Sequence, residues 1–194
     1  MPAEHSDQLP EVTARRTLAR GRRFEFQQLT VRRPGGATHE LEIVRHPGAV
    51  VILPILPGGD LVMIRVWRAA VARGLLEFPA GTLEAGESPE RCAARELIEE
   101  TGYRGGRLVA LGSFHTTPGL TDELMHAFAA LEPDAGAPAP EADENIRLVR
   151  VAAGEVMRLV DRGELQDGKS LAVLLLAWRR GLVDLGAARA PGAR

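Results

Sequence analysis

The hydrophobic positions along this chain are spaced mainly for β-strands. Residues 24–31 and 39–44 alternate apolar and polar side chains, and the Arg-Pro-Gly-Gly segment at 33–36 is typical of a turn. These two segments therefore predict an antiparallel hairpin near the N-terminus. Further strands are predicted at 50–56, 61–66, 108–114, 123–131 and 146–151.

The spacing becomes helical in three places, at 89–101, 153–162 and 170–180. The first of these helices has clear boundaries. Ser88 is suited to the N-cap, Pro89 to the first helical position and Gly102 to the C-terminal stop. In the last helix, Trp178 has the spacing of a core residue. Strands with one helix inserted and two helices at the end predict an α/β sandwich with a mixed sheet, preceded by a small N-terminal antiparallel β element.

The helix predicted at 89–101 carries an unusual concentration of acids. Its apolar stripe is predicted to be Ala93, Ala94, Leu97 and Ile98, with Glu96, Glu99 and Glu100 on the other side. Glu96 and Glu100 lie one turn apart and repel by a few tenths of a kcal/mol, approximately, on an exposed helix. Three carboxylates beside Glu87 suit a hard cation such as Mg²⁺ or Mn²⁺. Spacing alone is equally consistent with an ordinary amphipathic surface helix.

The residues at 81–103, GTLEAGESPERCAARELIEETGY, resemble the Nudix box, the signature of the Nudix hydrolases. That pattern is Gly, five residues, Glu, seven residues, Arg-Glu, an aliphatic, one residue, Glu-Glu, one residue, Gly, an aliphatic. The corresponding positions are Gly81, Glu87, Arg95, Glu96, Leu97, Glu99, Glu100, Gly102 and Tyr103. Tyr103 is the one departure, because it is aromatic where the strict pattern has an aliphatic residue.

The resemblance implies a Nudix-type α/β/α sandwich and hydrolysis of a phosphoanhydride with Mg²⁺, for which Mn²⁺ could substitute. Such a reaction needs cations on the diphosphate and a polarised water in line with the bond that breaks. The resemblance makes Glu96 and Glu100 the principal metal ligands, with Glu99 and Glu87 completing or supporting the cluster. It adds the backbone carbonyl of Ala80 as a further ligand. Arg95 is expected to orient a box carboxylate.

A second set of residues resembles the ADP-ribose pyrophosphatase branch of the family. It comprises HPGAVVILPIL at 46–56, VWR at 66–68, LLEFPAG at 75–81, Pro118 and the acidic stretch 141–144. Typical members have Gln-Tyr-Arg or Gln-Phe-Arg where this chain has Val66, Trp67 and Arg68. The resemblance implies cleavage of ADP-ribose to AMP and ribose 5-phosphate. The substrate-binding residues that it suggests are Arg68, Phe24, Phe26, Glu77 and Pro118.

Several parts of this interpretation stay open. A carboxylate outside the box is expected to help activate water, and Glu144 is preferred over Glu141 and Glu123. The substrate could instead be another nucleoside diphosphate sugar, a dinucleotide or a nucleoside triphosphate. An alternative of another class is a regulator that binds ADP-ribose without hydrolysing it.

In the ADP-ribose pyrophosphatase branch, an N-terminal β element helps to enclose the nucleoside and is often exchanged across a homodimer. Residues 1–45 are expected to do so here.

Composition and charge narrow the class of protein. The chain has 194 residues, a hydrophobic share of 45% and a charged share of 26%, as expected for one soluble globular protein. A net charge of −2 gives no reason to expect nucleic acid or a membrane as partner. Cys92 is the single cysteine and the N-terminus lacks an apolar signal segment, which together predict a cytoplasmic protein. The domain expected at 46–186 is the Nudix domain, followed by a disordered tail at 187–194.

Three other features are given ordinary interpretations. Residues 163–170, GELQDGKS, match the P-loop pattern, but the preceding residues have helical rather than strand spacing. The match is therefore interpreted as chance, with Lys169 solvated and with Ser170 or Asp167 capping the last helix. The arginines between 15 and 23 are expected to be solvated on an edge strand or turn. The histidines lack metal-ligand spacing, and His115 is the best exception because it borders the Pro118 loop.

Overall fold

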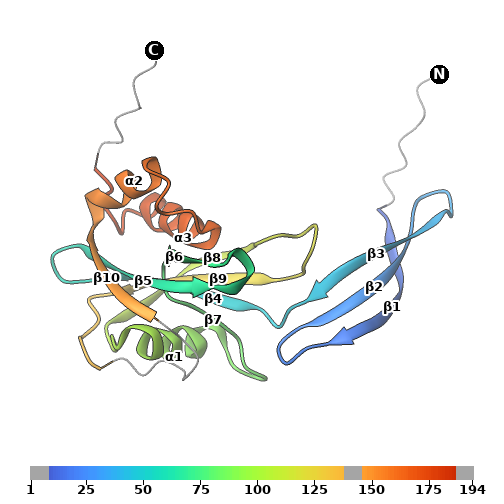
Figure 1. The fold of residues 1–194 in the computed structure, drawn as a ribbon, viewed down its shortest axis with the longest axis horizontal. Helices are drawn as coiled ribbons and strands as arrows, with labels where there is room; N and C mark the ends of the chain where they lie inside the picture. The colour runs from blue at the N-terminus through green and yellow to red at the C-terminus, as the bar shows by residue number, and fades with distance from the viewer. Residues whose placement is uncertain (1–8, 138–145, 187–194) are drawn as a thin grey trace, which may run out of the picture. The chain divides into compact units, whose positions relative to one another are not determined.

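The computed structural model describes residues 9–137 and 146–186, which form two compact units. Unit 1 contains the chain up to Pro47 together with His115–Leu124. Unit 2 contains Gly48–Phe114 and the described residues from Met125 onward. Figure 1 shows the elements of both units. The predicted tail at 187–194 lies outside the described residues.

Unit 1 is built on a three-stranded antiparallel sheet in the order β1-β2-β3. Its strands are β1 (Glu11–Arg20), β2 (Glu25–Arg32) and β3 (Thr38–Arg45). The predicted hairpin is confirmed as β2 and β3. For the arginines between 15 and 23, the sequence allowed either an edge strand or a turn. Most of this segment is strand β1, and all residues of β1 are exposed. The His115–Leu124 segment is joined to β3 by the Val44 N–H, which donates to the Leu120 carbonyl at 2.8 Å.

Unit 2 contains a seven-stranded mixed sheet whose main path is β10-β5-β4-β9-β8. Strand β4 pairs in parallel with β9 and in antiparallel with β5 and β7, while β5 also pairs in antiparallel with β6 and β10. The predicted mixed sheet is therefore confirmed. The strands are β4 (Ala49–Ile55), β5 (Asp60–Arg68), β6 (Arg73–Glu77), β7 (Ala80–Thr82), β8 (Arg107–His115), β9 (Leu124–Leu131) and β10 (Ile146–Ala152).

Helices cover both faces of this sheet (Figure 1). Helix α1 (Pro89–Thr101) packs on one face, and α2 (Ala153–Asp161) and α3 (Gly168–Arg179) pack on the other. Alternate residues of β4 point to opposite faces. Ile52 therefore joins the core beneath α1, whereas Leu53 joins the core beneath α2 and α3. Every residue of β4 is buried, as expected for a central strand covered on both sides. No helix among those described is long and apolar enough to cross a membrane.

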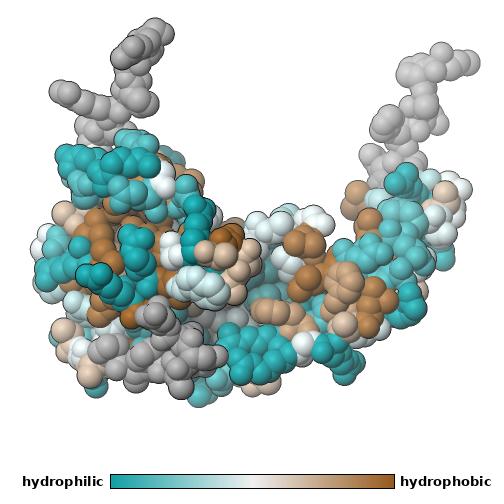
Figure 2. Space-filling model, in the orientation of Figure 1, coloured by the Kyte–Doolittle hydropathy of each residue, from teal (hydrophilic) through white to brown (hydrophobic). Residues whose placement is uncertain are grey.

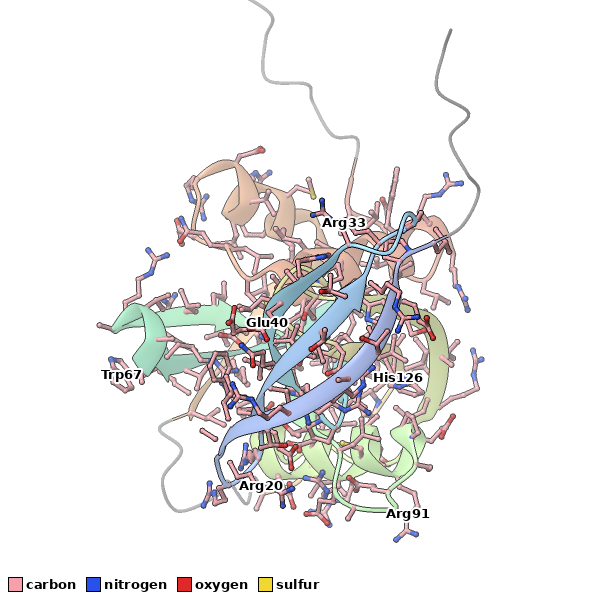
Figure 3. The ribbon with its side chains drawn as sticks, turned by 90° about the vertical axis from the view of Figure 1, so that its right-hand side faces the viewer. Arg20, Arg33, Glu40, Trp67, Arg91 and His126 are labelled. Atoms are coloured by element: carbon pink, nitrogen blue, oxygen red, sulfur yellow. The ribbon has the colours of Figure 1, made fainter. Side chains whose placement is uncertain are left out.

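Helix α1 has the predicted boundaries, but its faces differ in part from the prediction. The Ser88 side chain accepts from the Arg91 N–H, Pro89 is the first residue and Gly102 ends the helix in the left-handed conformation. The Arg91 side chain projects outward (Figure 3). The predicted apolar stripe is wrong at one edge, because Ile98 is 37% exposed and Glu100 only 4%. Burial of Glu100 is compensated by a backbone hydrogen bond, described below.

The predicted core position of Trp178 is also wrong. Its side chain is 47% exposed, because α3 buries another face that contains Ser170, Val173, Leu174 and Ala177. Helical spacing alone does not show which face of α3 packs against the sheet. Trp67 is similarly exposed on the β5–β6 hairpin, which connects through the short 3₁₀ helix Ala69–Val71 (Figure 3).

Candidate active site

Arg95 lies at the centre of a group of box carboxylates. Its Nε and Nη2 donate to the two carboxylate oxygens of Glu87 at 3.0 and 2.9 Å. Its Nη1 donates to Glu96 at 2.7 Å and to Glu99 at 2.9 Å. The guanidinium therefore reaches the loop before α1 and two acids of α1 itself. This is the arrangement expected of a residue that orients box carboxylates, and it offsets the repulsion among them.

These contacts shift the ionisation of both partners. The hydrogen bonds from Arg95 lower the pKa of Glu87 to about 2, against a smaller opposing effect of burial. The same hydrogen bonds, first with Glu87 and then with Glu96 and Glu99, raise the pKa of Arg95 above its ordinary value. Glu87 is therefore a carboxylate at any physiological pH.

Gly81 leaves the space that the Glu96 side chain occupies. Gly81 lies in β7, opposite Val50 of β4. A Cβ atom built at Gly81 would overlap the Glu96 carboxylate. The glycine of the box is thus required for the close approach of a side chain to the backbone, because any larger residue would fill the position of the acid.

Glu100 is the buried acid of α1. One of its carboxylate oxygens accepts from the Ala80 N–H at 2.8 Å, which compensates for the loss of water. Glu100 thus lies against the backbone of β7, at the residue whose carbonyl was predicted to be a metal ligand. The pairing of β7 with Ala49–Val51 fixes this backbone against the central strand of the sheet.

The donors present suit a hard divalent cation. Glu87, Glu96, Glu99 and Glu100 provide carboxylate oxygens within one loop and one helix, and the Glu96 carboxylate occupies the space that Gly81 leaves. Over the described ranges 9–137 and 146–186, no three or more His, Cys, Asp or Glu side chains are arranged to hold a metal ion together. In this structure Glu87, Glu96 and Glu99 are instead all paired with the Arg95 guanidinium.

A second charge network centres on Glu77, at the end of β6. Its side chain is only 1% exposed. Arg68 binds it through two parallel hydrogen bonds, from Nε to Oε1 at 2.9 Å and from Nη2 to Oε2 at 2.7 Å. The Lys169 ammonium donates to Oε2 as well and lies 2.9 Å from Asp167. Burial alone would raise the pKa of Glu77, but Arg68 and Lys169 outweigh it and lower the pKa.

The prediction that Lys169 is solvated is wrong. Its side chain is 14% exposed and is paired with two acids. The reason is the position of α3, whose first turn packs beside Glu77 and Phe78. Here the Ser170 hydroxyl accepts from the Phe78 N–H at 2.8 Å. Asp167 caps α3 by accepting from the Ser170 N–H, as one predicted alternative held.

The segment 163–170, which contains Lys169, also decides the P-loop match. The element before it is helix α2, so the P-loop match lacks its required strand, as predicted. The sequence did contain a signal for the Glu77 network. An acid inside the apolar run LLEF needs a cationic partner if it is buried, and Lys169 is the only lysine of the chain.

The remaining predicted residues of the described chain lie in unit 1. Phe24 stacks on His46 with ring centroids 4.8 Å apart, and Phe26 lies on β2 with part of its surface exposed. Exposed apolar side chains of this sheet appear brown among polar ones in Figure 2.

The other predicted residues lie in the His115–Leu124 segment, where Pro118 is exposed. Glu123 accepts from the Thr116 hydroxyl and lies 3.4 Å from His46, and the His115 ring contacts the Glu123 carbonyl. Glu141 and Glu144 lie outside the described residues.

Unit 2 also has an open groove of about 580 Å³ that contains none of the predicted site residues. It lies at the Ile55 end of β4, whereas the box strand β7 pairs with the Ala49 end. The groove therefore does not belong to the site that the box carboxylates form. The groove is lined by Ile55, Leu56, Gly58, Gly59, Gly106, Arg107, Leu131, Glu132 and Leu182.

Comparison with known proteins assigns the family. A family model described as the NUDIX domain matches residues 44–174. An ADP-ribose pyrophosphatase of Bacillus subtilis (strain 168) is 36% identical over 159 residues, which cover 81% of this chain and 86% of that protein. A methanol dehydrogenase activator of Bacillus methanolicus is 37% identical over 153 residues, covering 78% of this chain and 83% of that protein.

A solved structure supports the same fold. The crystal structure of an ADP compounds hydrolase superposes with a TM-score of 0.78 at 24% identity, covering 92% of this chain and 99% of that one. The fold, the box and these similarities together define a hydrolase of phosphoanhydrides. The chain belongs to the Nudix hydrolase family. Within it, the chain is a pyrophosphatase similar to the ADP-ribose pyrophosphatases.

Proposed function

We propose that this chain hydrolyses the diphosphate of ADP-ribose to AMP and ribose 5-phosphate. The observation that carries the proposal is the set of box carboxylates gathered by Arg95, with Glu96 held beside Gly81 and Glu100 against Ala80. The B. subtilis relative, named as an ADP-ribose pyrophosphatase, supports the choice of substrate.

The proposed reaction uses a divalent cation, Mg²⁺ with Mn²⁺ as substitute, in keeping with the usual metal dependence of the family. Glu96 and Glu100 would hold it, with Glu99, Glu87 and the carbonyl of Ala80 completing the set. When bound, the cation supplies charge neutralisation on the diphosphate and a polarised water. Arg95 pairs with Glu87, Glu96 and Glu99, which keeps these acids together before substrate arrives.

Arg68 is the proposed phosphate-binding residue. Two of the five N–H groups of its guanidinium point to Glu77, and the rest make no hydrogen bond to residues 9–137 and 146–186. A planar guanidinium oriented through one edge can present its other edge to phosphate oxygens. In this proposal, Glu77 contributes to phosphate binding indirectly, by orienting Arg68.

The remaining assignments follow the family resemblance. Residues 1–45 enclose the nucleoside and join two copies in a homodimer, with Phe24 or Phe26 stacking the base and with Pro118 as a further substrate-binding residue. Glu144 helps to activate water. A single species at monomer mass in light scattering would contradict the dimer, and an unchanged kcat for Glu144→Gln would contradict that role.

Product analysis by chromatography tests the proposal. The panel contains ADP-ribose, GDP-mannose, UDP-glucose, NADH, a diadenosine polyphosphate and a nucleoside triphosphate, each with Mg²⁺ and then Mn²⁺. We expect AMP to appear fastest from ADP-ribose. Faster turnover of another compound would retain the hydrolase and reject the substrate. Binding of ADP-ribose without turnover of any compound would reject hydrolysis and favour the regulator.

A further inference from the structure

Glu77 and its ion-pair partners form a group of two acids and two cations in unit 2. Glu77 is shared by Arg68 and Lys169, and Lys169 is shared by Glu77 and Asp167. The three elements involved are the β5–β6 pair, which carries Arg68 and Glu77, and the start of α3. These four side chains carry equal numbers of positive and negative charges around a carboxylate that is almost entirely removed from water, and Glu100 adds a further negative charge that acts on Arg68.

The charges in this group affect how strongly Glu77 holds Arg68, and so whether Arg68 can also bind an anion. A carboxylate buried with a single cation would hold that cation strongly, because the low dielectric of the interior strengthens the attraction. Lys169 contributes a second positive charge at Oε2, the same oxygen that Arg68 Nη2 contacts. The pull of Glu77 is thus divided between two cations. Glu77 anchors Arg68 through Nε and Nη2, while the rest of the partly exposed guanidinium makes no hydrogen bond among the described residues and can bind an anion.

We propose that Lys169 is a positioning residue for the substrate diphosphate, acting through Glu77 and Arg68. The proposal rests on the proposed function, since it assumes that Arg68 binds a diphosphate. Lys169 itself is engaged by Glu77 and Asp167 and is mostly buried, whereas Arg68 is partly exposed. Arg68 therefore contacts the anion, and Lys169 sets the orientation and charge of the group that holds Arg68.

A double-mutant cycle with Lys169→Met and Glu77→Gln tests this relation. The probe is ADP, which contains the diphosphate common to the candidate nucleoside diphosphate sugars. Its binding is measured by calorimetry in EDTA, so that no hydrolysis occurs. We expect Lys169→Met to weaken ADP binding by about tenfold, the scale of one charge-assisted hydrogen bond. In the Glu77→Gln background the same change should weaken binding by less than about twofold, because the charge that Lys169 balances is gone.

Two further variants separate positioning from a loss of fold. Lys169→Arg keeps the charge and should restore binding to within about threefold of the wild type. Arg179→Met removes an exposed positive charge from the same helix and should leave ADP binding unchanged. In steady-state kinetics with the fastest panel substrate, Lys169→Met should raise KM by about tenfold and change kcat by less than about threefold.

Several outcomes would overturn the inference. An equal loss of ADP binding in both backgrounds would mean that Lys169 contacts the phosphate directly. A lower melting temperature with unchanged ADP affinity would mean a structural role only. Failure of the wild type to bind ADP would remove the assumed diphosphate site. If the panel favours another nucleoside diphosphate sugar while the cycle behaves as expected, only the choice of ADP-ribose fails.

Discussion

The two charge networks of unit 2 are built in opposite ways. In the box, one cation, Arg95, is surrounded by the acids Glu87, Glu96 and Glu99, which leaves an excess of negative charge. Around Glu77, a buried acid is surrounded by the cations Arg68 and Lys169, of which Arg68 is partly exposed. The first arrangement suits a cation and the second an anion. A diphosphate hydrolase needs both, because the metal must be held while the substrate's own negative charge is accommodated.

The largest expected effect comes from removing an acid of the first network. Glu100→Gln should lower kcat by more than about a hundredfold, because even indirect partners of a metal site commonly account for ten- to a hundredfold. ADP binding in EDTA should stay within about threefold, since Glu100 acts on Arg68 through its charge alone, whereas Glu77 holds the Arg68 guanidinium by two hydrogen bonds. Glu90→Gln, an exposed acid of the same helix, is the matched control. Turnover close to wild type would show that the box acids do not perform the chemistry.

A smaller effect is expected from filling the space that the Glu96 carboxylate occupies. Gly81→Ala places a Cβ where the Glu96 carboxylate lies, so the acid must move away from its position near Arg95. We expect kcat to fall by about ten- to a hundredfold, as for other misplaced supporting groups. Gly154→Ala in α2 is the control, because no atom lies within 4 Å of its new Cβ. Equal kinetics for the two variants would contradict the role of Gly81.

The smallest effect concerns stability and pH. The pKa of Glu87 is lowered from 4.5 to about 2 by Arg95. The ionised contact therefore stabilises the folded protein above about pH 5, and this contribution is lost as pH falls through the folded value. In urea unfolding, the stability difference between wild type and Glu87→Gln should be constant from pH 7 to about 5 and should shrink toward about pH 2. A difference independent of pH would contradict this assignment.

Much of the fold was predictable because it depends on local signals. The caps of α1 and the β2–β3 hairpin are encoded by a few adjacent residues, and both are confirmed. The faces of α1 and α3 were less predictable. Whether Glu100 or Ile98 is buried depends on the backbone of β7, which supplies the Ala80 N–H from a different element. Spacing along one helix contains no information about that partner.

The site was predictable to a similar degree. Arg95 contacts acids that are near it in sequence, so these contacts could be anticipated from the box. The pairing of Glu77 with Lys169 joins residues far apart in sequence, and it forms only when α3 packs beside β6. Lys169 was consequently interpreted as solvated, although the buried acid in LLEF already required a cation.

The position of the single lysine has a practical consequence for covalent chemistry. Amine-directed reagents, including acylating labels and crosslinkers, have only one side chain to modify in this protein, and it is the one that balances Glu77. Because that amine is ion-paired and mostly covered, its rate of modification, read by mass spectrometry, reports whether the group around Glu77 is intact. Acylation there would also remove one of the two cations, so immobilisation through lysine would act directly on the proposed substrate site.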